Sequence, residues 1–262
     1  MNIVVCIKQV PDTTDVRINP ENNTLIRDGV PSIINPFDEN AIEEALRLKE
    51  KYGGKVTVIS MGPPQVEISL RDALAMGVDE AVLISDRAFA GSDTLATSYT
   101  LGKTIEKQLK EYDIILFGKQ AIDGDTAQVG PGVAEYLDIA QITYVVNIEN
   151  IDDKTIVVKR ELEDGYELVE AKLPVALTVL KGINTPRYPS LKGKMKAKIA
   201  TVTKITAADI EADEEKTGLN GSPTWVHKIF TPPAKGGAEK IIDDAGSSAN
   251  QIVAKMKKLK II

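Results

Sequence analysis

The stretch that decides the fold is Ile114-Ile115-Leu116-Phe117, followed by Gly118-Lys119-Gln120-Ala121-Ile122-Asp123-Gly124-Asp125-Thr126-Ala127-Gln128-Val129-Gly130. The apolar run predicts a buried parallel strand, and residues 126–137 predict a helix. A strand that ends in a small polar loop and then opens a helix is where open α/β sheets bind ligands. The loop has two carboxylates, two amides and one lysine. These groups suit ribose hydroxyls, adenine edges and a few backbone-bound phosphate oxygens.

The composition is that of an ordinary globular protein and excludes several kinds of site. The chain has 262 residues, 43% hydrophobic and 27% charged, with a formal net charge of −6. An acidic balance argues against a nucleic-acid partner. One cysteine and one histidine exclude zinc sites, disulfide frameworks and most Cys/His catalysis. No apolar run approaches the ~20 residues that span a bilayer, and the first residues predict a strand instead of a signal peptide. We therefore expect a cytoplasmic protein with no membrane partner.

Strand and helix patterns alternate in the first half, which predicts an α/β fold with a doubly wound, mostly parallel sheet. The expected strands are residues 3–7, 56–60, 81–85 and 113–117. Helices are expected between them, the third one capped by Ser92 or Asp93. Four further segments have strand character without helices between them, and they predict antiparallel hairpins at the edge of the sheet. These segments are residues 143–148, 155–160, 166–171 and 175–180.

The periodicity is lost after Gly182. We expect a nucleotide-binding domain at 1–184, an exposed segment at 185–200, and an extended C-terminal arm at 201–262 that ends in a helix. A long structureless stretch is unusual inside a compact domain. An arm that embraces a partner chain explains it, and a loosely attached tail is the alternative.

Small and polar residues gather at the expected carboxyl ends of the parallel strands, and such ends share one edge of a sheet. This edge predicts a nucleotide site, although turns and helix caps explain each segment taken alone. Cys6 is also typical of a small buried hydrophobe, since no basic group adjoins it. The chain has no Walker-type loop and no G-x-G-x-x-G motif, and we expect no catalytic side chain. The candidate cofactor-binding residues are Cys6, Asn35, Phe37, Asp38, Met61, Asp93, Thr94, Thr97, Lys119, Gln120, Ala121, Asp123, Gly124, Asp125, Thr126, Gln128, Val129 and Gly130.

With these residues in view, the chain resembles the β (small) subunits of electron transfer flavoproteins over nearly its whole length. The most specific motif is Gly118-Lys119-Gln120-Ala121-Ile122-Asp123. The others are Asn35-Pro36-Phe37, Glu43-Glu44-Ala45 to Leu48-Lys49, Ala73-Leu74-Ala75-Met76-Gly77 and Met195-Lys196-Ala197-Lys198. The resemblance implies a heterodimer with an α subunit that carries a flavin, and an adenine nucleotide bound at the edge described above.

Two branches of the family bind different nucleotides. One branch binds structural AMP. The electron-bifurcating branch binds a second FAD, which takes a hydride from NADH and divides the electrons between ferredoxin and the α-subunit flavin. The segment 92–98 resembles the bifurcating branch, in which hydroxyls matching Thr94 and Thr97 lie along the flavin. The resemblance also implies ribose and phosphate contacts from Asp125-Thr126 and Gln128-Val129-Gly130. Gly124 departs from the AMP branch, where this position is often acidic.

Residues 187–198 resemble the loop through which these flavoproteins dock onto acyl-CoA dehydrogenases, which implies a partner-docking loop at 185–200. Leu191 matches its anchoring leucine, and Met195 and Lys196 are further expected docking residues. We therefore expect a bifurcating β subunit that oxidises NADH only within the αβ complex. The closest alternative is a non-bifurcating β subunit that binds AMP. An alternative of another class is a universal-stress-type regulatory domain that binds an adenine nucleotide, but it needs neither the arm nor the docking loop.

Overall fold

The computed structural model describes residues 1–12, 31–227, 236–237, 241 and 247–262. The described residues up to His227 belong to one compact unit, and those from Gly236 onward belong to another. Among the described residues, none of the helices is both long and apolar enough to cross a bilayer.

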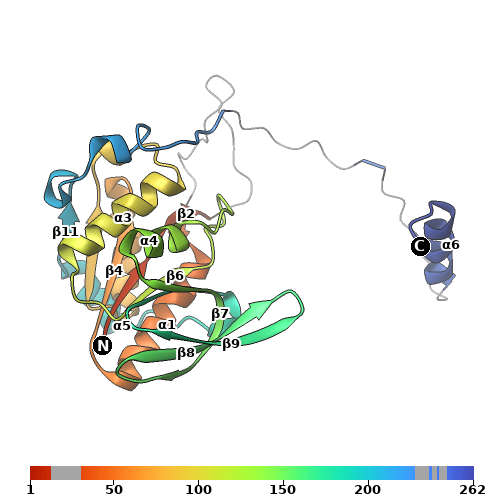
Figure 1. The fold of residues 1–262 in the computed structure, drawn as a ribbon, viewed down its shortest axis with the longest axis horizontal. Helices are drawn as coiled ribbons and strands as arrows, with labels where there is room; N and C mark the ends of the chain where they lie inside the picture. Colours follow the sequence, from red (N-terminus) through yellow and green to blue (C-terminus); the bar gives the residue numbers. More distant parts are fainter. Residues whose placement is uncertain (13–30, 228–235, 238–240, 242–246) are drawn as a thin grey trace. The chain divides into compact units, whose positions relative to one another are not determined.

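A sheet of nine strands among the described residues forms the centre of the first unit, in the order β11-β5-β4-β1-β6-β10-β7-β8-β9 (Figure 1). The strands from β11 to β7 in this order are parallel, and β8 and β9 continue from β7 as an antiparallel meander. The parallel strands are β1 (Asn2–Cys6), β4 (Lys55–Met61), β5 (Glu80–Ile84), β6 (Ile114–Gly118), β7 (Ala140–Ile151), β10 (Val175–Val179) and β11 (Val202–Ile205). The meander adds β8 (Thr155–Leu162) and β9 (Gly165–Lys172), and a separate antiparallel pair joins β2 (Gln9–Pro11) to β3 (Ser32–Ile34).

Helices cover both faces of the sheet. One face carries α1 (Pro36–Tyr52) and α2 (Glu67–Met76), and the other carries α3 (Thr94–Gln108) and α4 (Val129–Leu137). Successive side chains of a strand point to opposite faces, so Ile3 and Val5 of β1 join the core under α1 and α2, while Val4 and Cys6 join the core under α3 and α4. This double burial explains why the parallel strands are continuous apolar runs.

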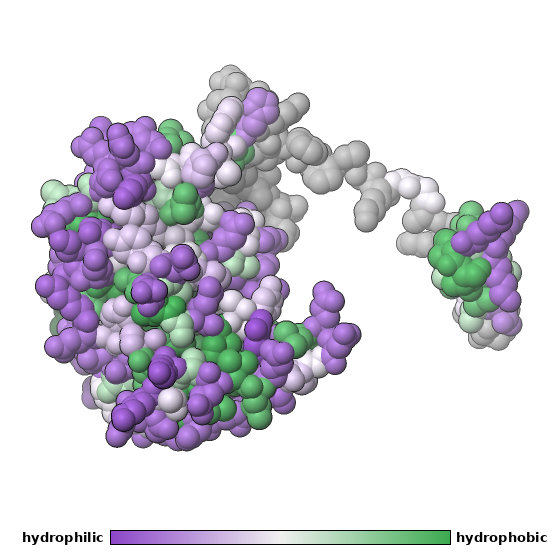
Figure 2. All heavy atoms as spheres, viewed as in Figure 1, coloured by the Kyte–Doolittle hydropathy of each residue, from purple (hydrophilic) through white to green (hydrophobic). Residues whose placement is uncertain are grey.

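Shorter helices complete the first unit, and α5 (Leu191–Ile199) packs on α2. The single-turn helices are η1 (Pro64–Val66), η2 (Arg87–Phe89), η3 (Lys181–Ile183), η4 (Ala208–Ile210) and η5 (Glu214–Lys216). In the second unit, α6 (Ser247–Lys258) gathers apolar residues along one side and lysines along another (Figure 2).

The expected doubly wound, mostly parallel sheet with antiparallel edge strands is confirmed. The expectation for residues 175–180 was wrong, because β10 lies between β6 and β7 and is parallel to both. Every residue of β10 is buried, as in a central parallel strand, whereas β8 ends in exposed residues and β9 is exposed along much of its length. Residues 202–205, within the expected arm, form β11 and pair with β5.

Candidate functional site

The carboxyl ends of the central parallel strands lie at one edge of the sheet. Cys6 at the end of β1 pairs with Ile59 of β4 and Phe117 of β6, and Gly118 pairs with Val179 of β10. The chain leaves β6 through residues 119–128, here named the site loop, and then enters α4. The expected binding residues therefore surround one edge, as the alternating pattern predicts.

Two buried side chains at the start of α1 fasten the site loop from behind. Asp38 accepts hydrogen bonds from the backbone N–H of Lys8 (2.7 Å) and of Gly118 (3.1 Å), and from Asn35 Nδ2 (3.0 Å). Asn35 Nδ2 also donates to the carbonyl of Gln120 (2.8 Å), and Asn35 Oδ1 accepts from the backbone N–H of Ile122 (3.1 Å). These bonds join β1, α1 and the site loop.

Burial changes the protonation of two groups at this edge. It raises the pKa of Asp38 to about 7, since the hydrogen bonds from Asn35, Lys8 and Gly118 offset the desolvation only in part. Burial, and then the charge of Asp38, raise the pKa of the Cys6 thiol. Cys6 is therefore a neutral side chain within β1 and not an activated nucleophile.

The outer part of the site loop is exposed and tightly turned. Lys8 Nζ forms an ion pair with Asp123 (2.6 Å), and Gln120 Nε2 donates to Asp125 Oδ1 (2.6 Å). Asp125 and Ala127 adopt positive φ angles of 51° and 54°. This conformation is unfavourable for residues other than glycine and is often found at functional sites. It also explains why α4 begins at Val129 and not at the expected residue 126.

The first turns of α3 and α4 are joined at the same edge. Asp93 caps α3 by accepting from the backbone N–H groups of Leu95 (2.9 Å) and Ala96 (3.1 Å). Thr94 Oγ1 donates to Gln128 Oε1 (2.8 Å), which connects the start of α3 to the start of α4. Gln128 precedes α4 without capping it through its side chain. No side chain in the described part of the chain caps the first N–H groups of α4, which suits an anionic ligand.

Glycine lets α4 approach the sheet closely. A Cβ atom at Gly130 would lie 2.7 Å from Thr178 Cγ2 and 3.3 Å from Phe117 Cγ, so a larger residue would displace the first turn of α4. A Cβ atom at Gly124 in the site loop would meet nothing within 4 Å. Gly130 therefore sets the position of the helix end, while Gly124 borders open space.

Three other candidates lie at the edge with their side chains in contact with protein. The Lys119 ammonium lies 5.1 Å from the centre of the Tyr144 ring, and Lys181 Nζ lies 5.1 Å from the centre of the Phe37 ring. Met61 ends β4, partly buried against the core under α3 and α4. Their contact with a nucleotide stays a prediction, as does that of Ala121, Thr126 and Thr97.

Sequence reasoning missed three residues that complete this edge: Lys8, Ser222 and Thr224. The backbone N–H of Asp93 donates to Ser222 Oγ (2.8 Å), and Thr224 donates its N–H (3.1 Å) and its hydroxyl (2.8 Å) to Asp93 Oδ2. Partial burial would raise the pKa of Asp93, but its four accepted hydrogen bonds lower it. Nothing in the sequence around residue 222 shows a periodicity that predicts this contact.

The expected docking residues lie away from the site loop, on α5. Leu191, Met195 and Lys196 are exposed, while Ala197 is buried against α2. The expected loop at 185–200 thus contains a helix, which Ser190 caps by accepting from the backbone N–H of Gly193 (3.0 Å).

Comparison with known proteins gives a consistent result over the whole chain. The electron transfer flavoprotein domain matches residues 22–210. The electron transfer flavoprotein subunit beta of Thermoanaerobacterium thermosaccharolyticum is 56% identical over 263 residues, and that of Megasphaera elsdenii is 50% identical over 271 residues. The caffeyl-CoA reductase-Etf complex subunit CarD of Acetobacterium woodii is 51% identical over 267 residues. Each comparison covers 100% of both chains.

Proposed function

The chain belongs to the electron transfer flavoprotein family as a β subunit, and we propose that it binds FAD at the carboxyl edge of its sheet and bifurcates electrons. A β subunit implies an α-subunit partner. The bound FAD would accept a hydride from NADH and release the two electrons one at a time. Ferredoxin is the proposed low-potential acceptor, and an acyl-CoA dehydrogenase receives the other electron through the α-subunit flavin.

The observation that favours FAD over AMP as the ligand is the surface at the start of α3, next to the first turn of α4. The Thr97 hydroxyl makes no hydrogen bond with any residue that the structure describes, and it lies on the same side of α3 as Thr94, one turn away. AMP, the alternative, has phosphate and ribose for α4 and the site loop, but no ring system for this second surface. A flavin ring is flat and apolar, with polar edges that hydroxyl groups can bind. The residues present therefore fit FAD.

We assign the roles of the residues from their positions. The backbone N–H groups of Val129 and Gly130 bind a phosphate, with Gly130 permitting the approach of the helix end. Asp123 and Asp125 lie in the exposed part of the site loop, and their carboxylates can accept hydrogen bonds from ribose hydroxyls in addition to those from Lys8 and Gln120. Thr94 and Thr97 lie along the flavin ring. Asn35 and Asp38 act through the site loop, because their polar atoms are already bonded within the protein.

The proposed electron acceptor follows from the relatives and from α5. CarD is named as a subunit of a complex with caffeyl-CoA reductase, an enzyme acting on a CoA thioester. An acyl-CoA dehydrogenase also acts on CoA thioesters, so we propose it as the partner of this chain. We place its docking site on the exposed Leu191, Met195 and Lys196.

The cofactor content of the purified αβ complex tests this proposal. Release of the cofactors followed by chromatography should give two FAD molecules and no AMP per heterodimer. One flavin with one AMP would contradict it. Thr94→Val with Thr97→Val should weaken retention of the β flavin, since each lost hydrogen bond is worth ~0.5–1.5 kcal/mol. Thr203→Val, at an exposed position of β11, is the matched control and should leave both flavins bound.

A further inference from the structure

The helix α5 presents an apolar face to solvent. Leu191, Met195 and Ile199 are spaced four residues apart and so share one side of the helix, with exposed fractions of 78%, 65% and 85%. Tyr188, just before the helix, is 96% exposed. We name Tyr188, Leu191, Met195 and Ile199 the α5 face. Such a continuous apolar stripe on a short surface helix is typical of an interaction surface.

The sequence of α5 does not favour a helix by itself. It has nine residues, which is too short for an isolated helix in water. Gly193 lies inside it and lowers the helix propensity. Lys192 faces Lys196, and Lys194 faces Lys198, at a spacing where like charges repel. The shape of α5 is therefore imposed by its contacts with the rest of the protein.

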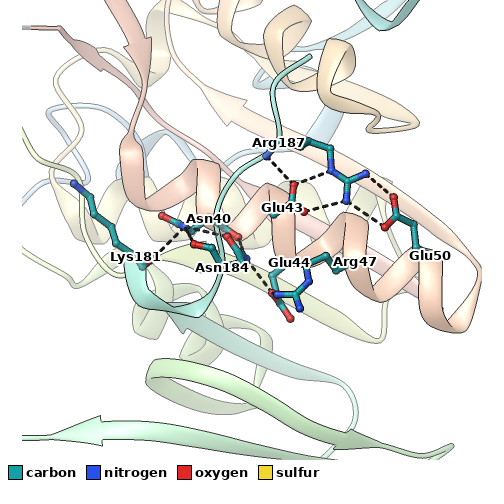
Figure 3. Close-up of polar contacts among 8 residues, drawn as sticks. All are labelled: Asn40, Glu43, Glu44, Arg47, Glu50, Lys181, Asn184 and Arg187. Carbon is teal, nitrogen blue, oxygen red and sulfur yellow. Dashed lines mark hydrogen bonds and ion pairs between the residues drawn. The ribbon is translucent and has the colours of Figure 1, made fainter. Parts of the chain in front are cut away.

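Arg187 fastens the chain to α1 just before the α5 face (Figure 3). Its guanidinium binds both oxygens of Glu43 (2.8 and 3.0 Å) and both oxygens of Glu50 (2.5 and 3.2 Å). Its backbone N–H also donates to Glu43 (3.1 Å). These hydrogen bonds raise the pKa of Arg187 and lower that of Glu50. Glu43 is buried, so a bidentate arginine is the partner that its charge requires.

A pair of asparagines extends this attachment toward β10 (Figure 3). Asn40 Nδ2 donates to the carbonyl and side-chain oxygens of Asn184 (both 3.0 Å), and Asn184 Nδ2 donates back to the Asn40 carbonyl (3.0 Å) and to Glu44 (2.9 Å). The route from β10 to Tyr188 is therefore bonded to α1 at two successive points.

Arg71 of α2 fastens the opposite end of α5. Its Nη1 donates to the carbonyls of Ala197 (2.7 Å) and Ala200 (3.1 Å), where a helix leaves carbonyl groups unpaired. Glu67 orients the guanidinium from the other side (2.8 Å). A Cβ atom at Gly193 would lie 2.2 Å from the carbonyl oxygen of Ala75, so α5 packs directly on the backbone of α2.

We propose that Arg187 and Arg71 are positioning residues that hold the α5 face in a preformed, binding-competent shape for an acyl-CoA dehydrogenase. This inference rests on the proposed function. A segment that is ordered before binding loses less conformational freedom on association, and so binds more tightly. The exposed lysines on either side of the apolar stripe suit a partner whose apolar groove has an acidic rim. Neither arginine touches the partner's reacting groups, so the effect belongs to recognition and not to electron transfer itself.

The test uses the purified αβ complex with a short-chain acyl-CoA dehydrogenase as the probe. The variant Arg187→Gln is combined with Glu43→Gln, so that no buried carboxylate is left without a partner. The KM for the dehydrogenase should rise about tenfold, with kcat and the rate of flavin reduction by NADH unchanged within about twofold. Lys103→Gln is the control, because Lys103 pairs with Glu106 inside α3, which covers the other face of the sheet. It should leave the KM unchanged. Arg71→Gln should act like the double variant.

A second background separates positioning from general destabilisation. In complexes that carry Leu191→Ala, the Glu43/Arg187 change should raise the KM less than twofold, because the side chain that it positions is absent. An equal rise in both backgrounds, or no rise in either, would overturn the inference while leaving the docking site intact. If Leu191→Ala alone leaves the KM unchanged, the docking assignment itself fails and this inference fails with it.

Discussion

At the scale of the residue, Asp38 is a carboxyl group that the fold buries where β1, α1 and the site loop meet. Its pKa in the folded protein is raised to about 7, above its ordinary value of 3.8. Between these two values the folded protein keeps a proton that the unfolded chain has released. The contribution of Asp38 to stability is therefore complete below pH 4 and is lost as the pH rises through 7.

The replacement Asp38→Asn tests this direction, because it removes the titration. Between pH 7 and pH 5, wild-type protein should gain about 2 kcal/mol of stability relative to the variant. The thermal midpoints of the two αβ complexes, measured in parallel at pH 5, 6 and 7, should diverge toward acid pH. A difference that stays constant over this range would show that Asp38 does not titrate there.

Gly130 is the residue whose size most directly controls the proposed phosphate site. In Gly130→Val, the new side chain would collide with Thr178 and Phe117 and displace the N–H groups of the first turn of α4. We expect the β-site nucleotide to be lost while the α-subunit flavin stays bound, as measured by chromatography of released cofactors. Gly124→Ala, which meets nothing within 4 Å, is the control for the loop. Equal nucleotide content in the Gly130→Val variant and wild type would contradict the placement.

At the scale of the element, the sequence predicts where strands and helices begin and end better than it predicts which of them lie next to each other. Hydrophobic periodicity is local, so it located β1, β4, β5 and β6 to within one or two residues. It could not show that β10 leaves the meander to lie between β6 and β7, because that pairing joins segments far apart in the chain. The complete burial of β10 is the signal that distinguishes it.

The candidate site divides in the same way. The site loop was predictable because it follows β6, whose end must reach this edge, and Asn35 and Asp38 were predictable because they stand at the start of the first helix of the alternating pattern. The hydrogen bonds from Asn35 and Asp38 to the backbone of this edge could not be predicted, because a side chain's partner depends on packing in three dimensions. Ser222 and Thr224 reach Asp93 from a segment without any periodic pattern.

The helices α3 and α4 carry two surfaces of the site, and small residues bring them together. A Cβ atom at Gly132 would lie 2.4 Å from Ser98 Oγ. Gly132→Ala should therefore destabilise the protein by ~1–2 kcal/mol through overpacking, despite the better helix propensity of alanine. Adding Ser98→Ala removes the colliding oxygen but leaves the Ser98 Cβ atom at 2.9 Å, so it should recover only part of the loss. Thermal unfolding of the two variants and wild type would measure both effects. A single variant as stable as wild type would show that the helices can move apart.

At the scale of the whole molecule, the C-terminal part of the chain has apolar side chains without a core to receive them. Leu219, Trp225 and Val226 are exposed in the first unit, and Ile252, Leu259 and Ile261 are exposed in the second. Ile229 and Phe230, which the sequence also marks as part of the arm, lie outside the described residues. A β subunit implies an α subunit. We propose that these side chains bind it.

The structure shows where the chain should be truncated to test whether its C-terminal part binds the α subunit. Strand β11 and the contacts of Ser222 and Thr224 belong to the first unit, so a truncation has to spare them and remove only residues 228–262. The shortened chain should no longer copurify with the α subunit. A full-length chain with Ile252→Asp in α6 and Leu259→Asp just after it should show the same loss, because charges at these exposed apolar positions oppose burial. Lys257→Gln, on the lysine-rich part of α6, is the control and should still copurify. Normal heterodimer formation after truncation would mean that the interface lies on the sheet domain and that the last residues serve another purpose.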